Sequence, residues 1–174
     1  MSLITIPSIE SATGDVKAVY DEMLESWGVV PEPIKAFSHN PRLLRNSWEM
    51  YKIEAQNENF SPKMTTTMRM LIAESHACEF CIGFNKGMLM NLFEVGEDEI
   101  VALQKDPNSA KLDEKQKAML LFMLKSTSTP HDVTKDDIEA LKKLSWSEQD
   151  IMEGVNQAAH MVATALFIDT FKIQ

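Results

Sequence analysis

The sequence lacks the features expected of nucleic acid-binding and membrane proteins. It holds 17 Lys and Arg against 26 Asp and Glu, which gives a formal net charge of −9. This acidic balance argues against binding to nucleic acid or to an anionic membrane surface. No window approaches the roughly 18 uninterrupted apolar residues of a membrane-spanning helix, and residues 1–7 lack the basic and apolar regions of a signal peptide. We therefore expect a cytoplasmic protein with no membrane partner.

Motifs for nucleotides and metals are also missing. The sequence contains neither a P-loop nor a GxGxxG pattern. No second CxxC pair completes a four-ligand zinc site, and the four histidines are scattered at positions 39, 76, 131 and 160. We therefore predict no bound metal and no cofactor.

The chain has only two cysteines, and both lie in the tetrapeptide Cys78-Glu79-Phe80-Cys81. Two thiols separated by two residues can close a small disulfide and reopen it, so the pair is predicted to be a redox couple. The alternative is a pair of buried, inert thiols, since cysteine also packs as a small hydrophobe. A purely structural disulfide is disfavoured, because so short a loop restrains the unfolded chain little. In the cytoplasm the pair would be reduced and oxidised only during turnover.

The length and the hydrophobic pattern predict one all-α domain over residues 1–174. No segment alternates apolar and polar residues between hairpin signals, so no sheet is expected. Residues 1–60 form an N-terminal helical region and residues 61–174 a core that carries the CxxC pair. Helical spacing and end signals predict these helices: 14–27, 34–38, 41–59, 62 to about 75, 78–93, 98–104, 113–126, and two more beginning after Thr134 and Ser147.

The last helix has an unusual composition. From Ala158 to Ile168 nearly every residue is apolar or small. A helix that is apolar all round is expected to be buried on all sides. It is therefore either a central core helix or one covered by a second subunit, and we favour a homo-oligomer.

The segment from Ser61-Pro62 through Cys78-Glu79-Phe80-Cys81 to Asn85 resembles the alkylhydroperoxidase AhpD-like proteins of the carboxymuconolactone decarboxylase superfamily. Their pattern is a helix opened by Ser-Pro, then Cys-x-aromatic-Cys, then a histidine four residues on. Residues 14–22, 30–44, 112–130 and 133–144 also look like the peroxidase-related branch of that family, so the resemblance covers most of the chain. The resemblance implies a helical, oligomeric protein whose cysteine pair reduces peroxides or exchanges disulfides.

The resemblance also implies roles for individual residues. The attacking thiol of the family falls on Cys81, and its resolving and proton-donating partner falls on Cys78. The family's relay glutamate and histidine fall on Thr66 and Asn85. A hydroxyl or an amide can form hydrogen bonds but cannot take up a proton near neutral pH. The usual proton relay is therefore missing from this chain.

Two neighbouring residues, His76 and Glu74, are candidates for replacing that relay, and a third, Asn85, for orienting a thiol. His76 lies two residues before Cys78, and an imidazole can accept a proton near neutral pH. Glu74 shares a helical face with both cysteines if the helix is continuous. Asn85 follows Cys81 by four residues and is expected to orient its thiol. The amides at the start of the helix near Cys78 would also favour a thiolate.

Three functions are consistent with these residues. The first is an antioxidant thiol peroxidase that reduces alkyl hydroperoxides and is regenerated by an external dithiol or a lipoyl-type reductant protein. The second is a thiol–disulfide exchange partner that does not act on peroxides. The third is a redox-silent oligomeric scaffold. The first is favoured because the resemblance spans most of the chain, although the missing relay weakens it relative to the second.

Overall fold

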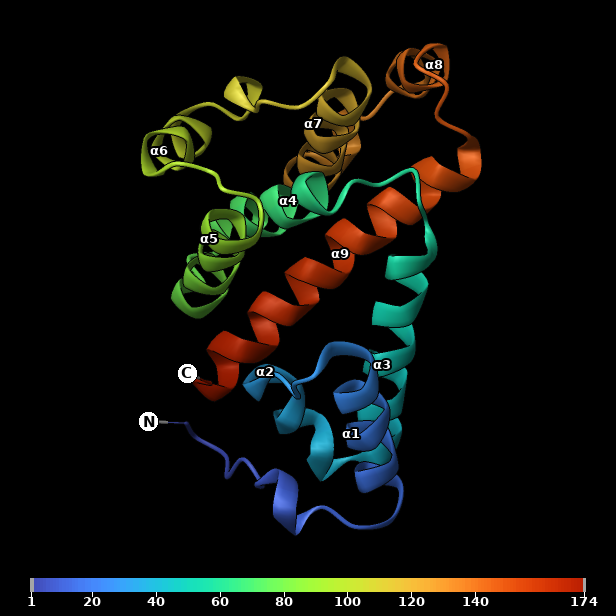
Figure 1. The fold of residues 1–174 in the computed structure, drawn as a ribbon. Helices are drawn as coiled ribbons and strands as arrows, with labels where there is room; N and C mark the ends of the chain where they lie inside the picture. The colour runs from blue at the N-terminus through green and yellow to red at the C-terminus, as the bar shows by residue number, and fades with distance from the viewer. Residues whose placement is uncertain (1, 174) are drawn as a thin grey trace. The chain divides into compact units, whose positions relative to one another are not determined.

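The structure, a computed structural model, describes residues 2–173, and all regular secondary structure in that range is helical. The prediction of an all-α fold is confirmed, and the helix boundaries agree with the sequence to within a few residues (Figure 1). The α-helices are α1 Gly14–Trp27, α2 Glu32–Lys35, α3 Pro41–Gln56, α4 Pro62–Ser75, α5 Glu79–Leu92, α6 Glu97–Lys105, α7 Glu114–Ser128, α8 Lys135–Lys143 and α9 Glu148–Phe171. None of the helices in the described range is long and apolar enough to cross a bilayer.

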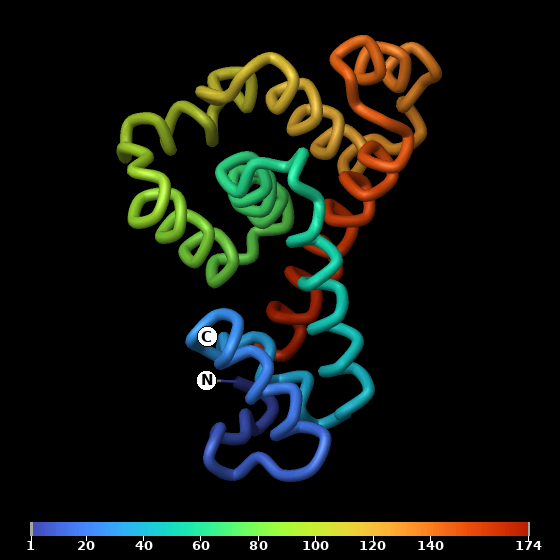
Figure 2. Tube along the Cα trace, turned by 45° about the vertical axis from the view of Figure 1, so that its right-hand side comes forward, coloured from blue at the N-terminus to red at the C-terminus, as the bar shows by residue number. Residues whose placement is uncertain are grey.

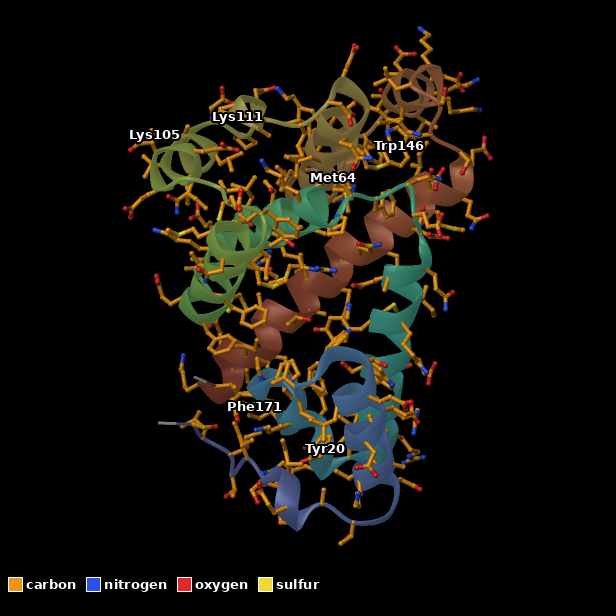
Figure 3. The ribbon with its side chains drawn as sticks, in the orientation of Figure 1. Tyr20, Met64, Lys105, Lys111, Trp146 and Phe171 are labelled. Atoms are coloured by element: carbon orange, nitrogen blue, oxygen red, sulfur yellow. The ribbon has the colours of Figure 1, made fainter. Side chains whose placement is uncertain are left out.

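The chain divides into two compact units. Unit 1 comprises Met1–Gln56 and Phe167–Gln174, and unit 2 comprises Asn57–Leu166. The core of unit 1 forms where α1 packs on α3. Its buried side chains are Val19, Tyr20, Met23, Val30, Ile34, Leu44 and Trp48, and Tyr20 is labelled in Figure 3. Gly28 ends α1 as the sequence predicts, in the left-handed conformation (φ 71°) that glycine adopts without a steric cost.

Helix α4 is the central element of unit 2. It packs against α5, α6 and α7, and Figure 2 shows it nearly end-on inside the arc that these three helices form. Because neighbours surround it, nine of its residues are buried, among them Met64, Met68 and Met70. Met64, labelled in Figure 3, is fully buried. An unbranched methionine adapts to irregular gaps in a core, which accounts for part of the high methionine content.

The caps predicted from the sequence are present. Ser61 accepts a hydrogen bond from the backbone N–H of Met64 at 3.2 Å and so starts α4. Thr134 and Asp137 form a complete capping box at the start of α8. Ser147 and Asp150 do the same for α9, since each side chain accepts a hydrogen bond from the backbone N–H of the other.

Residues 158–168 are not all buried within one chain, and the favoured alternative, coverage by a second subunit, stays a prediction. Ala158, Ala165 and Ile168 are buried, but Ala159, Ala163 and Leu166 are exposed. The side chain of Leu166 is 68% exposed. One face of α9 therefore contributes to the core while another apolar face meets solvent, which excludes a helix covered on every side within one chain.

Candidate functional site: the Cys78–Cys81 pair

The two thiols lie against each other at the start of α5. The Sγ atoms of Cys78 and Cys81 are 2.6 Å apart. Both residues are buried, with Cys78 0% and Cys81 3% exposed. Cys78 is the N-cap residue of α5 and Cys81 lies in its first turn. The pair is therefore positioned to form an intramolecular disulfide without rearrangement of the helix.

A tight turn between α4 and α5 positions Cys78. Ala77 has a positive φ of 54°, in the left-handed region. Its N–H donates to the carbonyl of Glu74 at 3.0 Å, and the N–H of Cys78 donates to the carbonyl of Ala73 at 3.0 Å. These two bonds form a Schellman motif, which closes the C-terminus of a helix. The carbonyl of Cys78 then accepts from Ile82 N–H at 2.9 Å and begins α5. Cys78 therefore completes the C-terminal cap of α4 and also begins α5.

Asn85 is a buried residue of α5, one turn after Cys81. Its Nδ2 donates to the carbonyl oxygen of Cys81 at 2.8 Å, and the residue is 4% exposed. The sequence predicts that Asn85 orients the Cys81 thiol, whereas the hydrogen bond it makes here is to the Cys81 backbone. Asn85 therefore reinforces the helical turn that carries the thiol.

The two candidate bases, Glu74 and His76, lie at the C-terminal end of α4. Glu74 is half-buried, and its Oε1 accepts a hydrogen bond from Nε2 of Gln104 on α6. His76 is exposed and is the C-cap residue of α4. The α4 helix does not continue through Cys78, so Glu74 and the cysteines do not share one helical face. A role for Glu74 or His76 as a proton acceptor stays a prediction.

Thr66 is deeply buried in α4. It is 1% exposed, and Thr65 and Thr67 beside it are also buried. The hydroxyls of Thr65 and Thr67 donate to the helix carbonyls of Pro62 and Lys63, at 3.2 and 2.8 Å. This stretch of α4 is therefore uncharged, and position 66 has no group able to take up a proton.

The exposed side of α5 next to the thiols is apolar. Phe80 and Phe84 stack with ring centroids 6.2 Å apart and an interplanar angle of 11°. Phe84 is 49% exposed and lies one turn after Cys81. Lys86, farther along α5, reaches toward Glu97 at 3.5 Å. An apolar molecule that approaches the start of α5 would meet these two rings.

Cation-binding groups do not converge in the part of the chain that the structure describes. No group of three or more His, Cys, Asp or Glu side chains there is placed to hold a metal ion. The reactive groups at this site are two thiols, so the chemistry it can support is nucleophilic attack by sulfur and disulfide formation.

Two contributors to the geometry were not predicted from the sequence. Ala77 has the left-handed conformation, and the usual signal for that conformation is a glycine or an asparagine. Gln104, 30 residues after Glu74 in the chain, donates a hydrogen bond to the Glu74 side chain. No local sequence pattern predicts such a distant contact. The CxxC motif itself did predict where the thiols would lie.

Comparison with known proteins found similar structures but no match by sequence. No family profile matches the sequence, and no curated protein matches it. Among solved structures, a peroxidase-related protein with an alkylhydroperoxidase AhpD core from Ralstonia eutropha JMP134 has a TM-score of 0.82 at 18% identity. The match covers 99% of this chain and 91% of that one. A peroxidase-related protein from Silicibacter sp. TM1040 has a TM-score of 0.78 at 19% identity, with the same coverage.

The first two proteins are uncharacterized, and a third similar structure is that of a debrominase. It is a cysteine-to-alanine variant of the debrominase Bmp8 in complex with 2,3,4-tribromopyrrole. It has a TM-score of 0.76 at 17% identity, and the match covers 100% of this chain and 93% of that one. These likenesses extend over nearly the whole length of both chains. The protein therefore has an AhpD-like, all-helical fold, with a Cys78–Cys81 pair at the start of α5.

Proposed function

We propose that the protein is a thiol peroxidase that reduces alkyl hydroperoxides through a dithiol–disulfide cycle of Cys78 and Cys81. The observation that carries the proposal is the 2.6 Å separation of the two sulfur atoms at the start of a helix. A thiol is activated when its thiolate is stabilised, and both a hydrogen-bond donor and helix N-terminal amides stabilise a thiolate. The AhpD-like fold supports the proposal because peroxidase-related proteins share it.

The cycle balances with the groups present and one external reductant. The Cys81 thiolate attacks the terminal oxygen of the hydroperoxide, which breaks the O–O bond and gives a sulfenic acid. The leaving alkoxide takes a proton and departs as an alcohol. Cys78 sulfur then attacks the Cys81 sulfur and releases water as the disulfide forms. An external dithiol, such as a lipoyl-type reductant protein, returns two electrons and two protons to the pair.

The position of Cys81 in the first turn of α5, near the free amides of the helix start, supports this division of roles. The two Sγ atoms lie 2.6 Å apart, so a proton held on Cys78 would stabilise negative charge on Cys81. Cys81 is also the more exposed of the two, at 3% against 0%. In the absence of the family's glutamate and histidine, Cys78 is the nearest proton donor for the alkoxide.

The burial of the pair favours a small substrate over a protein disulfide. Exchange with a protein requires a second disulfide to approach the attacking sulfur in line. With both thiols at most 3% exposed, that approach requires the start of α5 to open. A hydroperoxide needs only its terminal oxygen to reach the sulfur. The exchange function is therefore the second candidate, and the unreactive scaffold is the third.

A further candidate substrate is a brominated aromatic ring. The same two thiols would supply the two electrons that replace a carbon–bromine bond by a carbon–hydrogen bond, with release of bromide and formation of the disulfide. The stacked rings of Phe80 and Phe84 offer an aromatic surface on the helix that carries Cys81. The Bmp8 complex shows that a protein of this fold binds 2,3,4-tribromopyrrole.

The test is turnover with a defined reductant. Purified protein with dihydrolipoamide is given cumene hydroperoxide, hydrogen peroxide, 2,3,4-tribromopyrrole or a small protein disulfide in parallel. The proposal expects consumption of cumene hydroperoxide that is lost in both Cys81→Ser and Cys78→Ser. Turnover of the protein disulfide alone would establish exchange instead. Intact thiols and no turnover of any substrate would indicate a scaffold.

A further inference from the structure

An aromatic hollow lies within unit 1, on helices that do not carry the cysteine pair. It forms where the C-terminal turn of α1 meets the second half of α3 (Figure 1), and it has a volume of about 280 Å³. Every residue that lines it belongs to unit 1: Ser26, Trp27, Trp48, Tyr51, Lys52, Ala55 and Gln56. Two of the three tryptophans of the chain therefore stand in the walls of one hollow.

The rings of the hollow meet at right angles rather than in a stack. The ring centroids of Trp27 and Trp48 are 4.8 Å apart with an interplanar angle of 88°, and those of Trp27 and Tyr51 are 5.5 Å apart at 74°. Trp48 is 1% and Trp27 is 42% exposed, so Trp48 forms the base and Trp27 the outer wall. The face of an aromatic ring is negative. A corner between such faces fits a compact, rounded cation better than a flat ring.

A cation of the chain itself already lies over the base of the hollow. The Nζ atom of Lys52 is 5.7 Å from the centroid of the Trp48 ring, which is within the range of a cation–π contact. The same ammonium lies 2.7 Å from the carboxylate of Glu49. Its flexible four-carbon stem allows Lys52 to leave the ring and keep its bond to Glu49. The hollow therefore accepts positive charge, and its present cation is replaceable.

The charge around the hollow also favours a cation. Residues 1–56 hold eight Asp and Glu against five Lys and Arg. The hollow adjoins the C-terminus of α1, where the helix dipole places partial negative charge and the last turn carries no basic residue. Hydrogen bonds from Arg45 and Trp48 outweigh burial and lower the pKa of Glu22, which lies 3.7 Å from the Lys52 ammonium. An anionic ligand is therefore disfavoured.

We propose that this hollow binds a small solute that carries a quaternary ammonium group. The methyl groups of the ligand pack on Trp27 and Tyr51, and its charge takes the place of the Lys52 ammonium over Trp48. A trimethylammonium group has no N–H, so it leaves no hydrogen bond unmade when it moves from water onto ring faces. A primary ammonium is strongly hydrated and forms hydrogen bonds, so Lys52 gains more from Glu49 than from the ring.

The size and the rim of the hollow limit the rest of the ligand. A volume of about 280 Å³ lies just below the range of about 300–1,000 Å³ that is typical of pockets for drug-sized molecules. The ligand is therefore small. Ser26 and Gln56 line the hollow with a hydroxyl and an amide, which can form hydrogen bonds with a short polar tail. Choline has both parts, a trimethylammonium group and a hydroxyl, and is the probe for the tests.

The first test locates the probe and measures its affinity. The three tryptophans give three indole N–H signals in a ¹⁵N–¹H spectrum. Choline chloride, added at constant ionic strength, is expected to shift the signals of Trp27 and Trp48 and not that of Trp146, which lies in unit 2. The expected dissociation constant is about 1 mM or lower. The uncharged isostere 3,3-dimethylbutanol is expected to bind roughly fivefold more weakly, because it lacks the cation–π attraction.

The second test uses three variants, each checked for folding by circular dichroism. Trp27→Ala removes the outer ring and is expected to weaken choline binding about tenfold. Val29→Ala is the matched control, because Val29 is 55% exposed and lies outside the hollow, and it should leave the affinity unchanged. Lys52→Met keeps an apolar stem and removes the competing ammonium, so it is expected to tighten binding roughly threefold. A purely structural role for Lys52 would give no such gain.

Four results would overturn the proposal. Equal affinity for choline and 3,3-dimethylbutanol would show an apolar hollow with no preference for charge. Choline binding that Trp27→Ala does not weaken, or that Lys52→Met does not strengthen, would contradict the roles assigned to these side chains. Binding to phosphatidylcholine vesicles without binding to free choline would assign the hollow to a lipid headgroup instead of a solute. None of these measurements uses the thiols, so the result is independent of the redox proposal.

Discussion

The N–H of Cys78 donates to the carbonyl of Ala73 at 3.0 Å, so the last bond of the α4 cap is made by the first cysteine of the pair. The position of the Cys78 thiol is therefore fixed from both sides, by the end of α4 and by the start of α5. Ala77 is held between them at a φ of 54°. Strained backbone next to a reactive group is a recurrent feature of functional sites.

Ala77→Gly is expected to stabilise the protein. A left-handed conformation costs a residue with a Cβ about 1 kcal/mol, and glycine avoids that cost. Urea denaturation should show a gain of about that size in the free energy of unfolding. Ala118→Gly in the interior of α7 is the control, since there glycine should destabilise by about 1 kcal/mol. Equal losses in both variants would contradict the role assigned to Ala77.

Asn85→Ala is expected to weaken the helix turn while leaving the thiol acidity nearly unchanged. The variant removes the Nδ2–carbonyl hydrogen bond to Cys81, which contributes about 1 kcal/mol to stability. Because that bond is to the backbone, the pH midpoint of Cys81 alkylation should move little. A large rise in that midpoint would show instead that Asn85 acts on the thiol.

Asp150 is expected to make the protein sensitive to acid. Burial raises the pKa of Asp150, but hydrogen bonds from Ser147, Asn57 and Asn59 outweigh burial and lower it from 3.8 to about 2. A carboxylate whose pKa is lower in the folded state stabilises the fold above its unfolded pKa, and this stability is lost as the pH falls toward 2. The shift corresponds to about 2 kcal/mol at neutral pH.

Asp150→Asn should therefore unfold more easily at pH 7 and lose less stability between pH 4 and pH 2 than the wild type. The protein also loses the stability contributed by Asp137 over the same pH window. The hydrogen bonds from Lys125 and from the Thr134 backbone lower the pKa of Asp137 to about 2. The acid dependence should then be reduced in the variant without vanishing. If the variant lost as much stability as the wild type between pH 4 and pH 2, the role assigned to Asp150 would be contradicted.

Phe84→Ala is expected to impair turnover of bulky hydroperoxides selectively. The ring is half-exposed one turn after Cys81 on α5, and loss of a partly buried aromatic contact of about 1 kcal/mol corresponds to a roughly fivefold lower kcat/KM. Cumene hydroperoxide should show this loss and hydrogen peroxide should not. Leu92→Ala, at the far end of α5, is the matched control. Equal losses for both peroxides would place Phe84 in a structural role.

The sequence predicted the helix starts best where a capping side chain marks them. Ser61, Thr134 and Ser147 each start a helix because their hydroxyls accept hydrogen bonds from backbone N–H groups, and that chemistry can be predicted from the sequence. The CxxC motif likewise predicted a thiol pair at the start of a helix, because its two cysteines are neighbours in the chain.

The remaining features depend on backbone conformation and on distant contacts. Ala77 carries no sign of a left-handed residue, so the turn between α4 and α5 was not predicted. The amide of Asn85 can satisfy a thiol or a carbonyl equally well, and only the packing of the first turn decides between them. The composition of residues 158–168 indicated burial, but whether one chain or two cover the helix depends on how its neighbours pack.

The most direct test of the redox account is the acidity of the two thiols. The rate of iodoacetamide alkylation is measured against pH in the wild type, in Cys78→Ser and in Cys81→Ser. The rate follows the thiolate fraction, so its midpoint gives the pKa even when burial slows the reaction. The account predicts that Cys81 in the wild type titrates well below the ordinary value of about 8.5, and that its pKa rises in Cys78→Ser. If both thiols titrate at or above that value, the pair is not an activated couple and the peroxidase proposal fails.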